Sequence, residues 1–357
     1  MQTKLQKSNN SQWITAAAAI AACVFMAAPA ADAAPLPFTG TNLSGGEFGS
    51  RKPGVPATFN KDFTLPTENE FNYFASKGMN IFRIPFRWED LQPALGQPLD
   101  MPSVNRLKDV VTTATSKGLY VILDPHNYAR YYDDVVGGPK FTSDNFGDFW
   151  GRLADQFKDN PRVWFGLVNE PHDMPTQDWF NAAQAAITSI RKTGAKNTIL
   201  VPGNGWTGAH SWIGAGNDIL LKLVDPLNQC VFEAHQYLDT NNSGTHPDPV
   251  STTIGSERLK TFTDWCRRNH KKAFLGEFGV GASDKGRDAI NDMLTAMEKD
   301  SDVWLGFTWW SAGPWWGNYM FTIEPENLKD RPQMSYLKPH LHGVPMGSYF
   351  KMGPALQ

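Results

Sequence analysis

The chain has 357 residues, of which 33 are basic and 36 acidic, and its formal net charge is −3 at pH 7. No basic stripe stands out from this near-neutral balance, which excludes nucleic-acid binding as the main function. The length suits one large barrel or two modest domains and does not decide between them. With 13 Trp and 22 Phe, most aromatic rings must lie in the core, and a minority is left for stacking against a ligand.

The first residues are typical of a secretory signal peptide. Lysines precede an apolar stretch over 14–31, and small residues follow it up to Ala34. A basic start, a short apolar core and an A-x-A-like end are the parts of such a peptide. A membrane anchor is the alternative, but the stretch is slightly short for a spanning helix and no basic stop-transfer run follows it. We therefore predict a signal peptide over 1–34 and a secreted, extracellular domain over 35–357, without a membrane partner.

The chain has three cysteines, and Cys23 falls within the predicted signal peptide. Cys230 and Cys266 then form an even pair in an oxidising compartment, which predicts one disulfide. It would join the start of one strand to the end of the following helix. The spacing of these cysteines fits no zinc pattern.

Eight short apolar runs are predicted as β-strands. Several are almost wholly apolar, as expected for parallel strands covered on both faces. In chain order the runs are 38–43, 80–86, 120–124, 163–169, 198–202, 230–235, 273–277 and 303–310.

Amphipathic segments with helical spacing of their apolar residues lie between these strands. Thr176 and Asp178 are candidate N-caps, and Gly118 and Gly194 stand where helices should end. The expected helical segments are 104–117, 146–157, 179–193, 256–269 and 287–299.

The alternation of strands and helices predicts an α/β protein with a single-domain (β/α)₈ TIM barrel. A doubly wound open sheet is the alternative, but no glycine-rich dinucleotide turn follows an early strand. In a TIM barrel the active site lies at the C-terminal ends of the strands. The polar residues at those ends are therefore the candidates for function.

Two glutamates, Glu170 and Glu277, follow the fourth and seventh predicted strands. Hydrolysis of a glycosidic bond with retention requires two carboxyl groups about 5 Å apart, and opposite sides of a barrel mouth can supply that separation. The ordinary alternative is a surface or helix-capping acid. Burying an unpaired glutamate in Asn-Glu-Pro after an apolar strand would be costly, so we predict that Glu170 and Glu277 are the catalytic pair.

The strand ends together resemble glycoside hydrolase family 5, and within it the endoglucanase subfamily of secreted fungal and bacterial cellulases. The resemblance runs in order from the first to the eighth predicted strand, across nearly the whole mature chain. It is carried by Arg83, His126, Asn169, Glu170, His235, Tyr237, Glu277 and Trp310, and by the segments 203–210, 233–239 and 309–316.

The resemblance implies that Glu170 is the acid/base and Glu277 the nucleophile. Arg83 and Tyr237 would donate to Glu277 and keep it ionised. Glu170 must instead carry a proton before the first step. Two other acids of the strand ends, Asp124 and Glu233, are expected to be buried partners of a basic group.

Five further residues would contact the sugar. Asn169 would bond the 2-hydroxyl, and His126 and His235 would bond substrate hydroxyls or orient the carboxylates, unless they are core histidines satisfied by backbone. Trp310, which the family often follows with a cis peptide, would form the floor before the cleaved bond. Trp206 would be a platform on the leaving-group side. Weaker aromatic candidates are Tyr131, Tyr132, Trp212, Trp315 and Trp316.

The resemblance implies endo-acting, retaining hydrolysis of β-1,4-glucosidic bonds in cellulose and related β-glucans. A β-mannanase or a mixed-linkage β-glucanase would use the same machinery. A non-catalytic, secreted carbohydrate-binding barrel is the alternative of another class, and the presence of Arg83 and Tyr237 beside both glutamates argues against it. Two carboxyl groups supply both nucleophile and proton donor, so no cofactor or metal is expected. The expected partner is a polysaccharide substrate, bound by a monomer.

Overall fold

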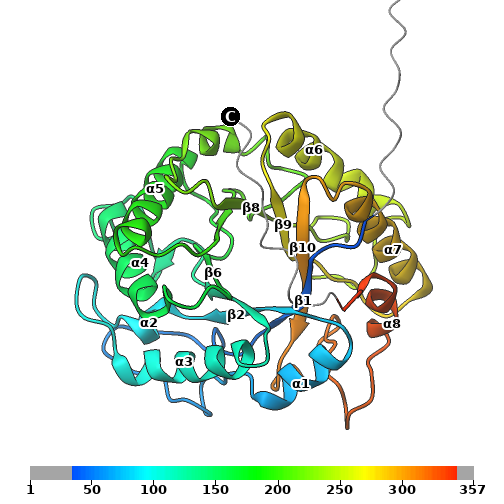
Figure 1. Cartoon of the computed structure of the whole chain (residues 1–357), viewed down its shortest axis with the longest axis horizontal. Helices are drawn as coiled ribbons and strands as arrows, with labels where there is room; N and C mark the ends of the chain where they lie inside the picture. Colours follow the sequence, from blue (N-terminus) through cyan, green and yellow to red (C-terminus); the bar gives the residue numbers. More distant parts are fainter. Residues whose placement is uncertain (1–33, 344–357) are drawn as a thin grey trace, which may run out of the picture. The chain divides into compact units, whose positions relative to one another are not determined.

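The computed structural model describes residues 34–343, so the predicted signal peptide lies outside the described residues except for Ala34. Eight parallel strands close into a barrel in the order β1-β10-β9-β8-β7-β6-β3-β2. Figure 1 shows the helices arranged around the outside of these strands. The (β/α)₈ barrel is confirmed, and the open doubly wound sheet is not formed.

The barrel strands lie close to their expected positions, and β1, β8 and β9 agree with them at both ends. The fourth strand ends at Gly166 rather than at the predicted residue 169. Beyond it the backbone still forms single hydrogen bonds to neighbouring strands, such as Asn169 N–H to the carbonyl of Pro125 at 2.9 Å. The strands are β1 (Phe38–Leu43), β2 (Ile81–Phe86), β3 (Tyr120–Pro125), β6 (Val163–Gly166), β7 (Ile199–Pro202), β8 (Cys230–His235), β9 (Ala273–Glu277) and β10 (Trp304–Ala312).

All five expected helical segments are present. The N-cap of the third is Pro175, so the prediction of Thr176 or Asp178 is wrong; Thr176 Oγ1 instead donates to the carbonyl of Ala215 at 2.7 Å. The helices are α1 (Glu68–Ser76), α2 (Trp88–Leu91), α3 (Met101–Thr115), α4 (Ser143–Phe157), α5 (Thr176–Lys192), α6 (Ile254–Arg268), α7 (Asp284–Lys299) and α8 (Met334–Leu337), with 3₁₀ turns η1 (Asn217–Lys222) and η2 (Lys338–His340).

Apolar side chains near the starts of the strands form a separate cluster that fills the lower part of the barrel. Because its members come from seven strands of one closed sheet, they must meet inside it. This layer forms an apolar floor, and the polar residues of the site lie above it. Its members are Phe38, Ile81, Ile122, Trp164, Leu200, Val231 and Phe274.

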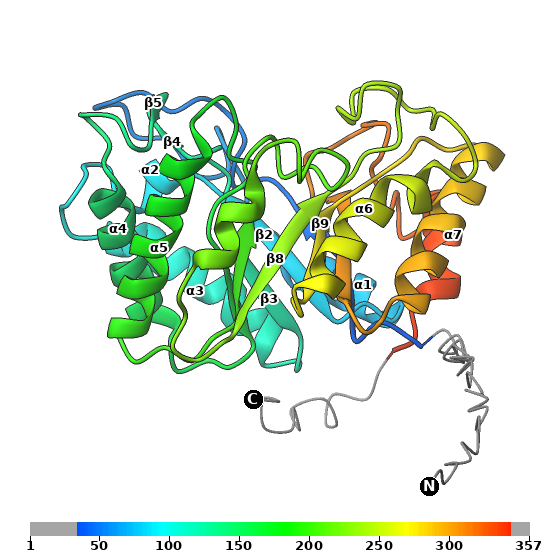
Figure 2. The same ribbon diagram turned by 90° about the horizontal axis from the view of Figure 1, so that it is seen from above.

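A short hairpin, β4 (Arg130–Tyr131) and β5 (Asp134–Val135), follows β3. Figure 2 places it among the loops at the upper end of the barrel. No helix among residues 34–343 is both long and apolar enough to cross a membrane.

Cys230 and Cys266 are free thiols, so the predicted disulfide is wrong. Cys230 begins β8, and its Sγ lies 3.5 Å from the carboxylate of Asp225. Cys266 is buried on the core side of α6. The two thiols thus have different surroundings, and burial raises the pKa of each. The even number of cysteines and the expected oxidising compartment suggested a disulfide, but the two thiols do not meet in the fold.

The seam between β1 and β2 predicts a test of barrel closure. A Cβ on Gly40 would overlap the carbonyl oxygen of Ile81 on the neighbouring strand, and backbone there cannot yield without opening the sheet. Gly40→Ala should lower the free energy of unfolding by about 3 kcal/mol. Denaturant unfolding measures this, with Gly214→Ala as the control, because a Cβ there meets only ordinary contacts. An equal effect of the two substitutions would contradict the close approach.

Candidate active site

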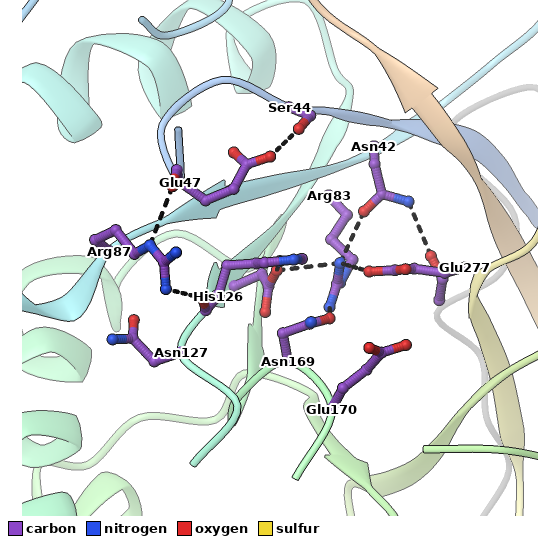
Figure 3. A network of polar contacts seen from close by, with 12 residues as sticks. Asn42, Ser44, Glu47, Arg83, Arg87, His126, Asn127, Asn169, Glu170 and Glu277 are labelled. Atoms are coloured by element: carbon purple, nitrogen blue, oxygen red, sulfur yellow. Dashed lines mark hydrogen bonds and ion pairs between the residues drawn. The ribbon is translucent and has the colours of Figure 1, made fainter. Parts of the chain in front are cut away.

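A buried arginine lies at the centre of the polar residues above the apolar floor. Arg83, the third residue of β2, has no exposed surface. Its Nη1 donates to Glu277 Oε1 and to Asn42 Oδ1, both at 2.9 Å, and its Nη2 donates to Asn169 Oδ1 at 2.7 Å. Figure 3 shows Arg83 between these three side chains, with Glu170 beside them. The guanidinium of β2 thereby joins side chains from β1, from β9 and from the segment that follows β6.

Two deeper carboxylates complete the surroundings of Arg83. Its Nη1 lies 3.1 Å from Asp124 Oδ2, and its Nε lies 3.2 Å from Glu233 Oε1. Both acids are 1% exposed, so they would be very costly without this cation. The expectation that Asp124 and Glu233 are buried partners of a basic group is confirmed.

Glu277 is the last residue of β9 and is held at both carboxylate oxygens. Oε1 accepts from Arg83, and Oε2 accepts from the Tyr237 hydroxyl at 2.8 Å. Burial raises the pKa of Glu277 to about 7, whereas His235, Arg83 and Tyr237 act in the opposite direction. A carboxylate fixed in this way can present an ionised oxygen to an electrophilic carbon.

Glu170 lies beyond the end of β6, in the left-handed region with φ of 40°. Its side chain is 14% exposed, compared with 5% for Glu277, and its Oε1 accepts from His235 Nδ1 at 2.8 Å. One oxygen of each glutamate and a nitrogen of His235 lie within 4.8 Å of one another. This separation suits double displacement, because retaining hydrolases hold their two carboxyl groups about 5 Å apart.

His235 connects the two glutamates to the deeper network. Its Nε2 lies 3.4 Å from Glu233 Oε1, and its Nδ1 lies 3.7 Å from Glu277 Oε2. Burial alone would lower the pKa of His235, but Glu277, Glu170 and Glu233 raise it to about 10. His235 is therefore an imidazolium that can donate from both ring nitrogens.

His126 and Trp310 form one wall of the site. The His126 ring stacks on the Trp310 ring, with 5.2 Å between centroids and 19° between planes. His126 Nδ1 contacts Asp124 Oδ2 at 2.8 Å, and burial lowers the pKa of His126 to about 3. A neutral ring that donates from Nδ1 leaves Nε2 free to accept. The peptide bond between Trp310 and Ser311 is cis, as expected.

Trp206 extends the site on the side of Glu170. It is 50% exposed, and one face of its indole stacks on His172, with 3.4 Å between centroids and 7° between planes. Tyr128 touches both rings edge-on. An indole backed by another ring on one face and open on the other can stack against the apolar face of a sugar.

A cavity of about 800 Å³ joins these parts. Of the nine residues predicted for catalysis or binding, seven line it and two, Arg83 and Asn169, lie directly behind Glu277 and Glu170. The seven are His126, Glu170, Trp206, His235, Tyr237, Glu277 and Trp310.

Several cavity residues carried no signal in the sequence that we recognised. Tyr128 and Tyr319 line the cavity, and Asn42 orients Arg83 from β1. Asn42 could have been found, because it lies next to the end of the first predicted strand, as the other site residues do for theirs.

The weaker aromatic candidates divide between core and rim. Trp212 and Tyr131 are buried in the core, whereas Trp315 is 42% exposed. Trp316 packs edge-on against Trp310, with 5.9 Å between centroids, and Tyr132 packs on Tyr131. None of the five is among the residues that line the cavity.

Among the described residues, one group of acids and histidines has the spacing of a metal site: Glu170, His235 and Glu277. The two glutamates of this group are the pair that the two-carboxylate reaction requires. Arg83 and the imidazolium of His235 supply the positive charge that balances the carboxylates.

Comparisons with known proteins agree with this geometry. The family described as Cellulase (glycosyl hydrolase family 5) matches residues 32–313. The chain is 43% identical over 309 residues to a probable endo-beta-1,4-glucanase B of Neosartorya fischeri, covering 86% of this chain and 92% of that protein. It is 43% identical over 287 residues to endo-beta-1,4-glucanase B of Aspergillus niger, covering 80% of this chain and 84% of that protein.

Solved structures give the same result. A triple variant of an endo-beta-1,4-glucanase from Xanthomonas axonopodis pv. citri has a TM-score of 0.84 and 48% identity, covering 87% of this chain and 100% of that one. XacCel5A in complex with cellopentaose has a TM-score of 0.83 and 48% identity, covering 85% and 99%. The endoglucanase Cel5A of Pseudomonas stutzeri in complex with cellobiose has a TM-score of 0.80 and 33% identity, covering 87% and 94%.

The ion pairs around Arg83 predict that removal of this residue destabilises the protein by an amount that depends on pH. Arg83→Ala should lower the free energy of unfolding by about 3–5 kcal/mol at pH 8, because it leaves buried carboxylates uncompensated. The loss should be smaller at pH 5, since burial raises the pKa values of Asp124 and Glu277 to about 7 and both are then largely neutral. Denaturant unfolding at the two pH values measures the difference.

Arg191→Ala is the matched control for this substitution. Arg191 forms a buried pair with Asp225 alone, and hydrogen bonds lower the pKa of Asp225 to about 2 against the opposing effect of burial. Asp225 is thus charged at both pH values, so Arg191→Ala should lower the free energy of unfolding by the same amount at pH 5 and pH 8. An equal loss at pH 5 and pH 8 for Arg83→Ala would contradict the proposed charge balance.

Proposed function

The chain belongs to glycosyl hydrolase family 5, the cellulase family, and from this membership we infer that it is a retaining endo-β-1,4-glucanase. It hydrolyses internal β-1,4-glucosidic bonds of cellulose and related β-glucans. The observation that carries the mechanism is the pair of glutamates at one barrel mouth, with oxygens within 4.8 Å of each other. The relatives described above favour glucan over mannan, because all are named as endoglucanases.

In the first step, Glu277 attacks the anomeric carbon and Glu170 protonates the departing glycosidic oxygen. Arg83 and Tyr237 hold the two oxygens of Glu277, so the attacking group is oriented before substrate arrives. Glu170 carries the proton that it transfers, and its 2.8 Å contact with His235 Nδ1 orients its carboxyl group. The carboxylate charge of Glu277 is consumed as the glycosyl ester forms.

In the second step, Glu170 accepts a proton from water, and that water attacks the anomeric carbon and releases Glu277. Because the anomeric carbon is inverted twice, the product keeps the β configuration. Glu170 is the more exposed of the two glutamates, which suits a residue that must meet water.

The sugar before the cleaved bond lies on Trp310. Asn169 Oδ1 accepts from Arg83, whereas Asn169 Nδ2 is buried and has no partner in the described structure. That unsatisfied donor is placed for the 2-hydroxyl, a bond that strengthens in the transition state. Trp206 supports the leaving-group sugar. Binding surfaces on both sides of the carboxylates suit cleavage within a chain rather than at its end.

The protein is secreted and acts outside the cell as a monomer on its polysaccharide substrate. The basic start, apolar stretch and small residues before Pro35 support a signal peptide. The catalytic domain then spans 35–357. Every residue assigned above to the site comes from this one barrel.

The stereochemistry of the product tests the mechanism. Proton NMR of the first products from cellopentaose should show the β anomer before mutarotation equilibrates it. Accumulation of the α anomer first would rule out double displacement and both assigned roles. The fall in viscosity of a carboxymethyl-cellulose solution, compared with its release of reducing sugar, distinguishes endo from exo action.

Substitutions of the two glutamates separate their roles. Glu277→Gln should reduce kcat by a factor on the order of 10⁴ or more, while calorimetry still detects cellopentaose binding. Glu170→Gln should lose far more activity on cellopentaose than on a dinitrophenyl cellobioside, whose leaving group needs no proton. Glu257→Gln on the surface of α6 is the control. Normal turnover by Glu277→Gln would remove the nucleophile assignment.

A further inference from the structure

The ring of Tyr237 is in contact with the segment that follows β8. Tyr237 is buried, and its ring lies nearly parallel to that of Phe321, with 6.1 Å between centroids and 19° between planes. A Cβ on Gly244 would lie 2.6 Å from Cδ1 and 2.7 Å from Cγ and Cε1 of Tyr237. The backbone at Gly244 therefore lies directly against the ring, with no room for a side chain.

A buried carboxylate holds Gly244 in this place. Asp239 is 2% exposed, and its Oδ1 accepts from the Gly244 N–H at 3.2 Å. Its Oδ2 accepts from the Ser243 hydroxyl at 3.1 Å and from the His246 N–H at 3.3 Å. Gly244 has φ of +68°, which glycine adopts without strain. The segment 239–246 is thus closed around one side chain.

The base of the segment is fixed to the scaffold. Arg258 of α6 donates from Nη1 to the carbonyl oxygens of Tyr237 and Asp239, each at 2.8 Å. Gln236 Nε2 lies 3.3 Å from Asn242 Oδ1. Movement of Gly244 away from the ring would therefore break hydrogen bonds to the Asp239 carboxylate and strain those from Arg258 to the start of the segment.

We propose that Gly244, held by Asp239, is a positioning residue for the nucleophile, because its backbone sets the Tyr237 ring so that the hydroxyl reaches Glu277. This rests on the proposed function, in which Glu277 attacks the sugar. A methyl group at position 244 must displace the ring, and the 2.8 Å bond from Tyr237 to Glu277 is lost or lengthened. Gly244 does not contact Glu277 itself, but its position determines whether Tyr237 can donate to the Glu277 carboxylate.

Loss of this bond has a defined electrostatic consequence. The Tyr237 hydroxyl helps to lower the pKa of Glu277, which burial raises to about 7. Without it the pKa rises further, so ionised Glu277 is present only at higher pH. The acid limb of the kcat/KM profile must then move to higher pH. The charged and titratable groups that face Glu277 are Arg83, Tyr128, Glu170, His235, Tyr237 and Tyr319.

A double-mutant cycle on the full chain tests the proposal. Tyr237→Phe, Gly244→Ala and the double variant are assayed on cellopentaose across pH. Each single variant should lower kcat/KM by about tenfold to a hundredfold, mainly through kcat, as expected for a lost bond to a charged group. Each should move the acid limb to higher pH. The double variant should lie within about twofold of Tyr237→Phe, because both remove the same bond.

Gly96→Ala is the matched control, since Gly96 has φ of +72° and nothing lies within 4 Å of its added Cβ. It carries the backbone strain without the contact, so its acid limb should not move. Additive losses in the cycle, or a rise in KM with kcat and the acid limb unchanged, would overturn the proposal. If Tyr237→Phe itself leaves the limb in place, the assignment of Glu277 is at fault instead.

A second variant covers the case in which Gly244→Ala does not fold, judged by circular dichroism. Asp239→Asn retains the size of the side chain but removes the charge that gathers the N–H groups of Gly244 and His246. It should move the acid limb in the same direction by a smaller amount. An unshifted limb in a folded Asp239→Asn enzyme would equally overturn the role of the segment.

Discussion

The site depends on one buried cation. Arg83 has no contact with solvent, yet it lies within 3.2 Å of three carboxylates, those of Asp124, Glu233 and Glu277. Removing a charge from water costs several kcal/mol unless partners replace the solvent. The guanidinium offers five N–H donors in a fixed plane, so one side chain can serve acids from three different strands. The barrel brings these acids together because the C-terminal halves of its parallel strands surround one interior.

Two acid–histidine pairs show how the network sets charge. Asp124 lies on β3 and His126 directly follows that strand, whereas Glu233 and His235 both lie on β8. In each pair the acid and the histidine are two residues apart and contact each other. The pKa values of the two histidines nevertheless move in opposite directions. Burial lowers that of His126 to about 3, with Arg83 and Arg87 adding to the effect. Glu277, Glu170 and Glu233 outweigh burial at His235 and raise its pKa to about 10. The same motif therefore yields a neutral acceptor on one side of the site and a charged donor on the other.

The sequence predicted the parts of the molecule that depend on local pattern. Apolar strands followed at once by polar residues identified the barrel, the position of Glu277 and the buried partners of Arg83. Features that depend on packing between distant segments were not predictable in this way. The five weaker aromatic candidates could not be divided from sequence into the buried Trp212 and Tyr131 and the exposed Trp315. The predicted disulfide is wrong for the same reason, because the number of cysteines and the cellular compartment do not reveal whether two thiols meet in the fold.

The proposed acid/base, Glu170, and the proposed leaving-group platform, Trp206, are connected through backbone rather than through side chains. Glu170 and Trp206 both lie in the left-handed region, with φ of 40° and 60°, which is costly for residues other than glycine. The N–H of Trp206 donates to the carbonyl of Pro171 at 3.0 Å, and the next residue, His172, stacks on the indole. Protonation of the leaving oxygen requires Glu170 and the departing sugar to keep a fixed relative position. A strained turn that carries both the acid and the support of the platform meets that requirement, whereas two independently mobile loops would not.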